Sequence, residues 1–183
     1  INSDMREPRF LALGGSLQFL FFEAGVNPGA FEPMRVWHTR RQGLGEWGDL
    51  AVLFDGPEVP WDIKVQEDRA YLTSYTGDHN PGEHMGDLQV LFRTSTDGDN
   101  WALVDDVPYV YRGGVSEAAF EFDTDGSLWI VTRNEDGDNS GFGSHLCVAP
   151  ATALAAWECP EDSNPERYDS PEMFRHEDDL SLI

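Results

Sequence analysis

The sequence predicts an all-β fold, namely a β-propeller of four-stranded antiparallel blades, with about three and a half blades of a five- or six-bladed ring in this chain. Three observations predict it. Short apolar runs alternate with tight polar turns along the whole chain. No segment keeps a long helical period. A pattern of two hairpins returns about every 55 residues, slightly more than the usual length of a propeller blade.

Two recurring features mark the repeat. A strand, a polar loop and a tryptophan recur at steps of 54 and 56 residues, with Trp47, Trp101 and Trp157. A strand, a tight turn and a second strand keep the same step, at 9–21, 62–75 and 117–131. We therefore treat 1–183 as a single partial propeller domain, with blades at 6–56, 57–108 and 109–165 and an incomplete one at 166–183. Because a propeller closes with about 4 to 8 blades, we expect the remaining blades from the same chain or from a second copy.

The charge of the chain excludes two classes of partner. The sequence has 34 acidic and 12 basic residues, which gives a formal net charge of −22. Such a protein is repelled by the phosphates of nucleic acids and by anionic lipid. The longest apolar run is also far shorter than the ~20 residues that span a bilayer. We expect neither nucleic acid nor a membrane as partner.

The two cysteines, Cys147 and Cys159, flank a segment that reads as strand, loop and strand. This arrangement can bring them opposite each other, so we expect a disulfide in a secreted or periplasmic protein. The alternative is a pair of buried free thiols in a cytosolic protein.

Two carboxylates stand where the chemistry of a propeller is expected. The first strand of each blade lines the central channel, so residues at its start converge on the axis. Asp62 and Glu117 occupy such positions in the second and third blades. Two carboxylates facing each other across a pocket are what glycoside hydrolysis needs, one protonated and one ionised. The alternative is that strand ends are polar because they meet solvent.

Long loops between the second and third strands should open on the same face and carry specificity. His79 and His84, in the second of these loops, are candidate sugar-binding residues. We predict no metal and no cofactor, because the five-step spacing of these histidines matches no metal pattern. Residues 136–139 resemble a calcium loop in composition alone.

Residues 95–101, Ser-Thr-Asp-Gly-Asp-Asn-Trp, resemble the Asp box of sialidases and other propeller glycosidases, Ser-x-Asp-x-Gly-x-x-Trp, with one residue fewer between Asp and Trp. The resemblance implies a structural turn between the third and fourth strands, on the face away from the active site. In such a turn Ser95 and Asp97 would cap the backbone next to Gly98. Trp101 would pack between blades.

A second segment, 116–134, is similar to the part of sialidases in which a Glu opens a strand, an Asp-Gly turn follows and an Arg ends the next strand. The resemblance implies that Glu117 polarises a tyrosine nucleophile, which would lie beyond Ile183. It also implies that Arg133 clamps a substrate carboxylate, a task suited to a planar guanidinium. The segment around Arg9 resembles the family's Arg-Ile-Pro motif only distantly, and Arg9 is a second candidate for substrate binding.

Two further hypotheses remain open beside a sialidase-like hydrolase of extracellular or periplasmic glycans. Asp62 and Glu117 also look like the catalytic acids of five-bladed furanosidases, the arabinanases and invertases, in which such acids begin the inner strands of successive blades. That resemblance implies Glu117 as general acid, Asp62 as modulator of its pKa and a base from another blade. The third hypothesis is a propeller that binds carbohydrate or protein without turnover.

Overall fold

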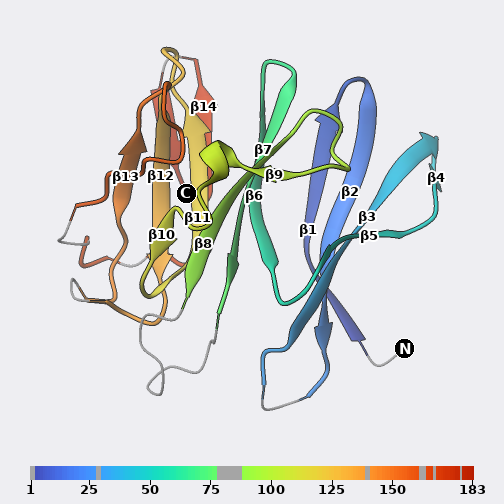
Figure 1. Ribbon diagram of the computed structural model, residues 1–183, viewed down its shortest axis with the longest axis horizontal. Coiled ribbons are helices and arrows are strands. Elements are labelled where there is room, and N and C mark those ends of the chain that lie inside the picture. Colours follow the sequence, from blue (N-terminus) through green and yellow to red (C-terminus); the bar gives the residue numbers. More distant parts are fainter. Residues whose placement is uncertain are drawn as a thin grey trace.

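The computed structural model describes residues 3–27, 30–77, 88–138, 141–160, 164–166, 168–177 and 179–183. They form antiparallel sheets that stand side by side (Figure 1). Within these residues the one helical element is a 3₁₀ turn, η1 (Val104–Asp106), and no helix is long and apolar enough to cross a membrane. The prediction of an all-β fold built from antiparallel blades is confirmed.

Blade 1 has five strands rather than four. Its order is β1-β2-β3-β4, and β5 also pairs with β3. The β1–β2 hairpin turns at Gly14 and Gly15, whose φ angles of 58° and 77° suit a two-residue turn that other residues adopt at a cost. The short strand β4 extends the β3 hairpin outward. The bounds are β1 (Ser3–Leu13), β2 (Ser16–Gly25), β3 (Pro33–Gly43), β4 (Glu46–Trp47) and β5 (Ala51–Asp55).

Blade 2 has the order β10-β8-β7-β6, and β9 also pairs with β8. Two short strands, β9 and β10, share the place of the fourth strand because η1 interrupts the chain between them. The bounds are β6 (Val59–Gln66), β7 (Arg69–Thr76), β8 (Gln89–Ser95), β9 (Ala102–Leu103) and β10 (Tyr111–Arg112).

Blade 3 has three strands, β11 (Val115–Phe122), β12 (Leu128–Asn134) and β13 (Leu146–Ala149). An isolated bridge from Val148 to Glu158 stands in place of a fourth strand. The disulfide between Cys147 and Cys159, with Cα atoms 4.2 Å apart, closes this outer edge. A separate hairpin follows, formed by β14 (Met173–His176) and β15 (Asp179–Leu182).

The core lies between the sheets, where apolar faces of neighbouring blades meet. Phe22 of blade 1 packs with Trp61 of blade 2, Phe92 of blade 2 packs with Phe120 of blade 3, and Val131 of blade 3 packs with Met173 of the last hairpin. The first strands of successive sheets are neighbours: β1 contacts β6, β6 contacts β11, and β11 contacts β14. This arrangement brings the starts of these strands together.

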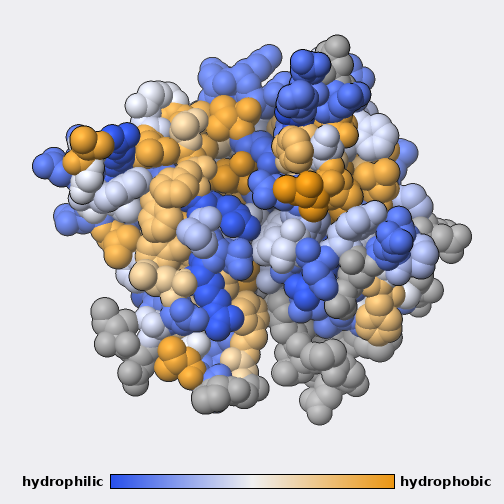
Figure 2. Space-filling view, turned by 180° about the vertical axis from the view of Figure 1, so that it is seen from behind, coloured by the Kyte–Doolittle hydropathy of each residue, from blue (hydrophilic) through white to orange (hydrophobic). Residues whose placement is uncertain are grey.

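One face of blade 1 is turned away from blade 2 and carries large apolar side chains. Phe10 is 59% exposed and Trp47 is 40% exposed. Seen from behind, where blade 1 lies on the left, the surface shows a patch of apolar side chains on that half (Figure 2).

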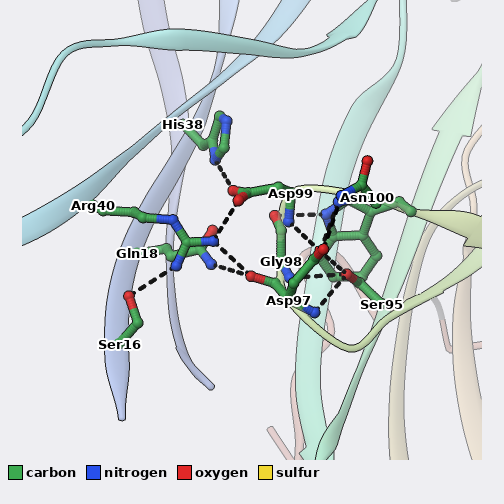
Figure 3. A network of polar contacts seen from close by, with 10 residues as sticks. Ser16, Gln18, His38, Arg40, Ser95, Asp97, Gly98, Asp99 and Asn100 are labelled. Atoms are coloured by element: carbon green, nitrogen blue, oxygen red, sulfur yellow. Dashed lines mark hydrogen bonds and ion pairs between the residues drawn. The ribbon is translucent and has the colours of Figure 1, made fainter. Parts of the chain in front are cut away.

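The turn formed by residues 95–101 joins blade 2 to blade 1 (Figure 3). Ser95 Oγ accepts the Gly98 N–H at 2.8 Å, and Asp97 Oδ1 accepts two N–H groups further along the turn. From blade 1, Gln18 Nε2 and Arg40 Nη2 donate to the carbonyl oxygen of Asp97 at 2.9 and 2.6 Å. The turn is therefore both capped within itself and held by the neighbouring blade.

The same turn also contributes charge and packing. Asp99 forms an ion pair with Arg40 at 2.7 Å and lies 3.5 Å from His38 Nδ1. Trp101 meets Phe54 of blade 1 edge to face, with ring centroids 6.5 Å apart. These residues lie outside the linings of the two cavities described next.

Candidate functional site

Two cavities lie along the first strands of the sheets. The Glu117 cavity has a volume of about 350 Å³ and is lined by residues that include Glu7, Tyr75, Glu117, Arg133 and Glu135. The Asp62 cavity has a volume of about 490 Å³ and is lined by residues that include Glu7, Arg9, Asp62, Lys64 and Ser170. Glu7 belongs to both linings, so it marks the boundary between the two cavities.

Glu117 is held in place by both of its oxygens. The pairing of β11 with β12 shifts register between Val115 and Ala118, and such a bulge re-aims the side chain that it carries. Glu117 Oε1 accepts Arg133 Nη1 at 2.8 Å, and Oε2 accepts the backbone N–H of Ser170 at 2.9 Å. Burial raises the pKa of this carboxyl, against the opposing influence of Arg133 and Ser170. The side chain therefore holds its proton to a higher pH than an exposed glutamate.

Arg133 is surrounded by carboxylates. Its guanidinium contacts Glu117 and Asp169 at 2.8 Å each and Glu135 at 3.5 Å. Burial alone would lower the pKa of Arg133, but the three carboxylates raise it above the ordinary value. A substrate carboxylate placed here would meet the three carboxyl groups that already contact this cation, of Glu117, Asp169 and Glu135. Arg133 thus fixes Glu117 rather than presenting a vacant clamp.

Glu7 lines both cavities and lies at an irregularity in β1. Its φ is 50°, in the left-handed region that non-glycine residues avoid. The pairing of β1 with β2 shifts register between Arg6 and Arg9, on either side of it. Strained, bulged positions of this kind cluster at functional sites. Glu7 Oε2 accepts Arg9 Nη2 at 3.2 Å, and the side chain is partly exposed toward both cavities.

Asp62 points at the backbone of the neighbouring blade. Its Oδ2 accepts the N–H of Phe120, three residues after Glu117, at 3.0 Å, and its Oδ1 forms an ion pair with Lys64 Nζ at 3.0 Å. Burial raises the pKa of Asp62, while Lys64 opposes the rise. The expectation that Asp62 and Glu117 face each other across one pocket is not met, since they line separate cavities. The reason is that Asp62 binds the strand that carries Glu117.

Arg9 and Trp61 form the wall between blades 1 and 2. The Arg9 guanidinium lies 5.1 Å from the Trp61 ring centroid, and Arg9 Nε donates to the Trp61 carbonyl oxygen. Trp61 Nε1 donates to the carbonyl oxygen of Pro171 at 3.1 Å. Residues 169–171 therefore contact Arg133, Glu117 and Trp61, and they brace both cavities from one segment.

Tyr75 is the tyrosine beside Glu117 in the described lining. Burial raises its pKa, and the nearby Glu117 raises it further. A phenol in these surroundings keeps its proton at neutral pH.

His79 and His84 lie outside the described residues, as does the end of the 136–139 stretch. Within the described part of the chain, no group of three or more His, Cys, Asp or Glu side chains is arranged to hold a metal ion.

Sequence reasoning identified four residues that line the two cavities. Glu117 and Arg133 line the Glu117 cavity, and Arg9 and Asp62 line the Asp62 cavity. It did not single out Glu7, which lies in the middle of the first inner strand, β1. Its left-handed backbone conformation depends on the bulge in β1, and no sequence motif predicts that bulge.

Comparison with known proteins shows likeness in structure alone. No family model matches the sequence, and no curated protein matches it. A GH43 enzyme from Xanthomonas citri superposes with a TM-score of 0.62 at 12% identity, over 100% of this chain and 67% of its own. An α-L-arabinanase from Penicillium chrysogenum, complexed with arabinobiose, gives 0.60 at 13% identity, over 97% of this chain and 58% of its own.

A Hadza microbial sialidase gives a TM-score of 0.64 at 14% identity, over 95% of this chain and 37% of its own. The chain therefore has the fold of the propeller glycoside hydrolases. It spans between about a third and two thirds of the length of these solved proteins, so it matches part of their propellers.

Proposed function

We propose that this chain is part of a five-bladed, furanosidase-type glycoside hydrolase that acts on neutral glycans, with Glu117 as general acid and Glu7 as the second carboxylate. The observation that carries the proposal is the Glu117 cavity, in which carboxylates from blades 1 and 3 share one lining. A protonated carboxyl and an ionised carboxylate on either side of a glycosidic bond are the working parts of such hydrolases.

Glu117 suits the acid because burial raises its pKa. Its proton goes to the glycosidic oxygen as the bond to the anomeric carbon breaks. Arg133 and Ser170 hold the side chain in one orientation and stabilise the carboxylate that remains.

Glu7 suits the second role because it lines the same cavity from blade 1. As a carboxylate it either activates a water molecule or attacks the anomeric carbon. Asp62 supports the acid indirectly, because its hydrogen bond to the Phe120 N–H fixes β11 three residues after Glu117. We therefore assign Asp62 to positioning.

The charges of the cavity favour a neutral sugar over a sialoside. Of the described cations in its lining, Arg133 contacts three carboxylates and Arg6 pairs with Asp4 at 2.7 Å. An anionic sugar would add a negative charge to a lining that already contains Glu7 and Glu135 beside the protonated Glu117. The likeness to an arabinanase bound to a neutral disaccharide agrees with this preference.

We further propose that the protein works outside the cytoplasm. The disulfide between Cys147 and Cys159 supports this location, because such bonds persist in oxidising compartments.

The test is an activity panel on the full-length protein, with arabino-oligosaccharides, xylo-oligosaccharides and a sialoside as substrates. We expect release of neutral sugars and a loss of turnover of about 10²- to 10⁴-fold in Glu117→Gln. Glu121→Gln, a glutamate on the same strand whose side chain binds the Phe122 N–H, is the matched control and should keep its activity. Hydrolysis of the sialoside alone contradicts the proposal, and glycan binding without any turnover favours the binding platform.

A further inference from the structure

A third cavity lies between blades 1 and 2, beside the turn formed by residues 95–101, and we call it the seam cavity. It has a volume of about 400 Å³, within the range of small-molecule sites. Its lining includes Phe54, Arg93, Asp99, Asn100, Trp101 and Ala102. None of these residues lines the Glu117 cavity or the Asp62 cavity. The seam cavity is therefore separate from the candidate active site.

The seam cavity and the Glu117 cavity lie toward opposite ends of blade 2. Ser95, where the turn begins, pairs with Ala70 of β7. Tyr75, which lines the Glu117 cavity, lies near the other end of β7 and pairs with Val90. Ala70 and Tyr75 are roughly 16 Å apart along the strand. A single sugar unit held in the seam cavity is therefore too far away to be the sugar that is cleaved.

Two aromatic rings form a fixed corner of the seam cavity. Trp101 and Phe54 have ring centroids 6.5 Å apart, with an angle of 72° between the ring planes. Trp101 Nε1 donates to the carbonyl oxygen of Gly98 at 2.9 Å, and the Arg93 guanidinium lies 4.8 Å from the Phe54 ring centroid. Both rings are thus held in place without a ligand, which lowers the cost of binding one.

The charged side chains of the lining already have counter-ions. Arg93 donates to both carboxylate oxygens of Glu58 at 2.9 Å. Asp99 forms an ion pair with Arg40 at 2.7 Å and points toward it in Figure 3. A charged ligand would have to compete with these two pairs. The seam cavity therefore favours an uncharged ligand.

Polar groups of the lining still have capacity for hydrogen bonds. Asn100 Nδ2 donates to Asp97 Oδ2 at 2.8 Å. Neither Asn100 Oδ1 nor Arg93 Nη1 has a hydrogen-bond partner among the residues that the structure describes. An acceptor and a donor group beside aromatic rings match a ligand that carries hydroxyl groups on an otherwise apolar ring.

We propose that the seam cavity binds a neutral sugar unit of a glycan, as a second carbohydrate site apart from the candidate active site. The C–H groups of the sugar ring pack on the aromatic corner, and its hydroxyl groups bind Arg93 Nη1 and Asn100 Oδ1. A glycan that reaches both sites binds more tightly than at either one, because its second contact is intramolecular. The sugars used as probes below rest on the proposed function, but binding at the seam cavity requires no turnover.

Ala102→Arg tests the site by filling it. Ala102 is an exposed residue of the lining, so a long side chain there occupies the seam cavity and leaves the core unchanged. Thr96→Arg is the matched control, because Thr96 is exposed in the same turn, is not a lining residue and receives the same charge. Ala102→Gln and Thr96→Gln replace this pair if Ala102→Arg melts at a lower temperature than its control.

An NMR titration of the full-length protein measures binding at the seam cavity. The probes are arabinotriose, xylotriose and sialyllactose, and Glu117→Gln is present throughout to keep the sugars intact. The indole N–H signal of Trp101, assigned from its absence in Trp101→Phe, should shift with at least one of the two neutral trisaccharides. Ala102→Arg should raise the dissociation constant read from this signal by about tenfold or more, and Thr96→Arg should leave it unchanged.

Three outcomes overturn the proposal. They are no shift of the Trp101 signal with either neutral trisaccharide, an equal loss of affinity in the two arginine variants, and tighter binding of sialyllactose, which would assign the cavity to anionic sugars. Failure of the proposed function is seen separately, as an absence of hydrolysis by the protein with Glu117 intact, because the Trp101 signal reports binding alone.

Discussion

The turn between blades 1 and 2 makes a quantitative prediction at Gly98. Its φ is 76°, and a Cβ added there would lie 2.2 Å from Gln18 Nε2 and 2.8 Å from Gln18 Cδ. Gln18 is fully buried and donates to the carbonyl oxygen of Asp97. Gly98→Ala therefore strains the backbone and also displaces a buried amide from its acceptor.

The two costs are separable. A left-handed backbone costs an alanine about 1–2 kcal/mol, and a buried polar group without its partner costs about 1–3 kcal/mol. The free energy of unfolding should fall by roughly 2–5 kcal/mol in Gly98→Ala. Gly15→Ala is the matched control, because Gly15 has φ 77° and no atom within 4 Å of the added Cβ, so it bears the backbone cost alone.

Urea unfolding of both variants measures the difference. We expect Gly98→Ala to be less stable than Gly15→Ala by about 1–3 kcal/mol, and Gln18→Ala to remove most of that difference in the double variant. Equal losses in the two glycine variants would refute the claim that Gln18 is locked against this turn.

Three further predictions concern the described sites. Burial raises the pKa of Asp62, so the stability that its protonated form contributes is complete below the pKa of the unfolded chain and is lost as the pH rises through the pKa of the folded protein. In urea unfolding over this pH range, the free energy of unfolding of Asp62→Asn should increase relative to that of the wild type, and a constant difference would contradict the prediction. Arg133→Lys should lower kcat on neutral glycans, because an ammonium cannot bridge three carboxylates, whereas a loss confined to acidic sugars would support the sialidase hypothesis. Replacing Cys147 and Cys159 by alanine opens a loop of 12 residues' separation and should cost about 3 kcal/mol in unfolding experiments; no loss would show that the bond does not constrain the unfolded chain.

The fold was predictable from the sequence because the hairpins of each blade have signals within short stretches of sequence. Alternating apolar residues and turn residues such as Gly14 and Gly15 specify hairpins within a few residues of chain, and the tryptophan spacing sets their repeat. The fifth strand of blade 1 was missed, since β4 is two residues long and its pattern is too short to read.

The site was predictable in part. The strand starts identified Glu117 and Asp62, but the direction of each side chain depends on bulges in β11 and β6. These bulges send Asp62 to the Phe120 amide and away from Glu117. The contacts of Ser170 and Asp169 with the Glu117–Arg133 pair join residues far apart in sequence, and composition alone does not indicate such contacts.

The role of Glu117 as general acid is tested most directly by varying the leaving group. In the full-length protein, Glu117→Gln should hydrolyse a dinitrophenyl arabinofuranoside with nearly the wild-type kcat/KM, because that leaving group departs without a proton. Against an alkyl arabinofuranoside its kcat/KM should fall by about 10²- to 10⁴-fold. Glu7→Gln should lose activity on both substrates. Equal losses of Glu117→Gln on the two substrates, or none on either, would contradict the assignment.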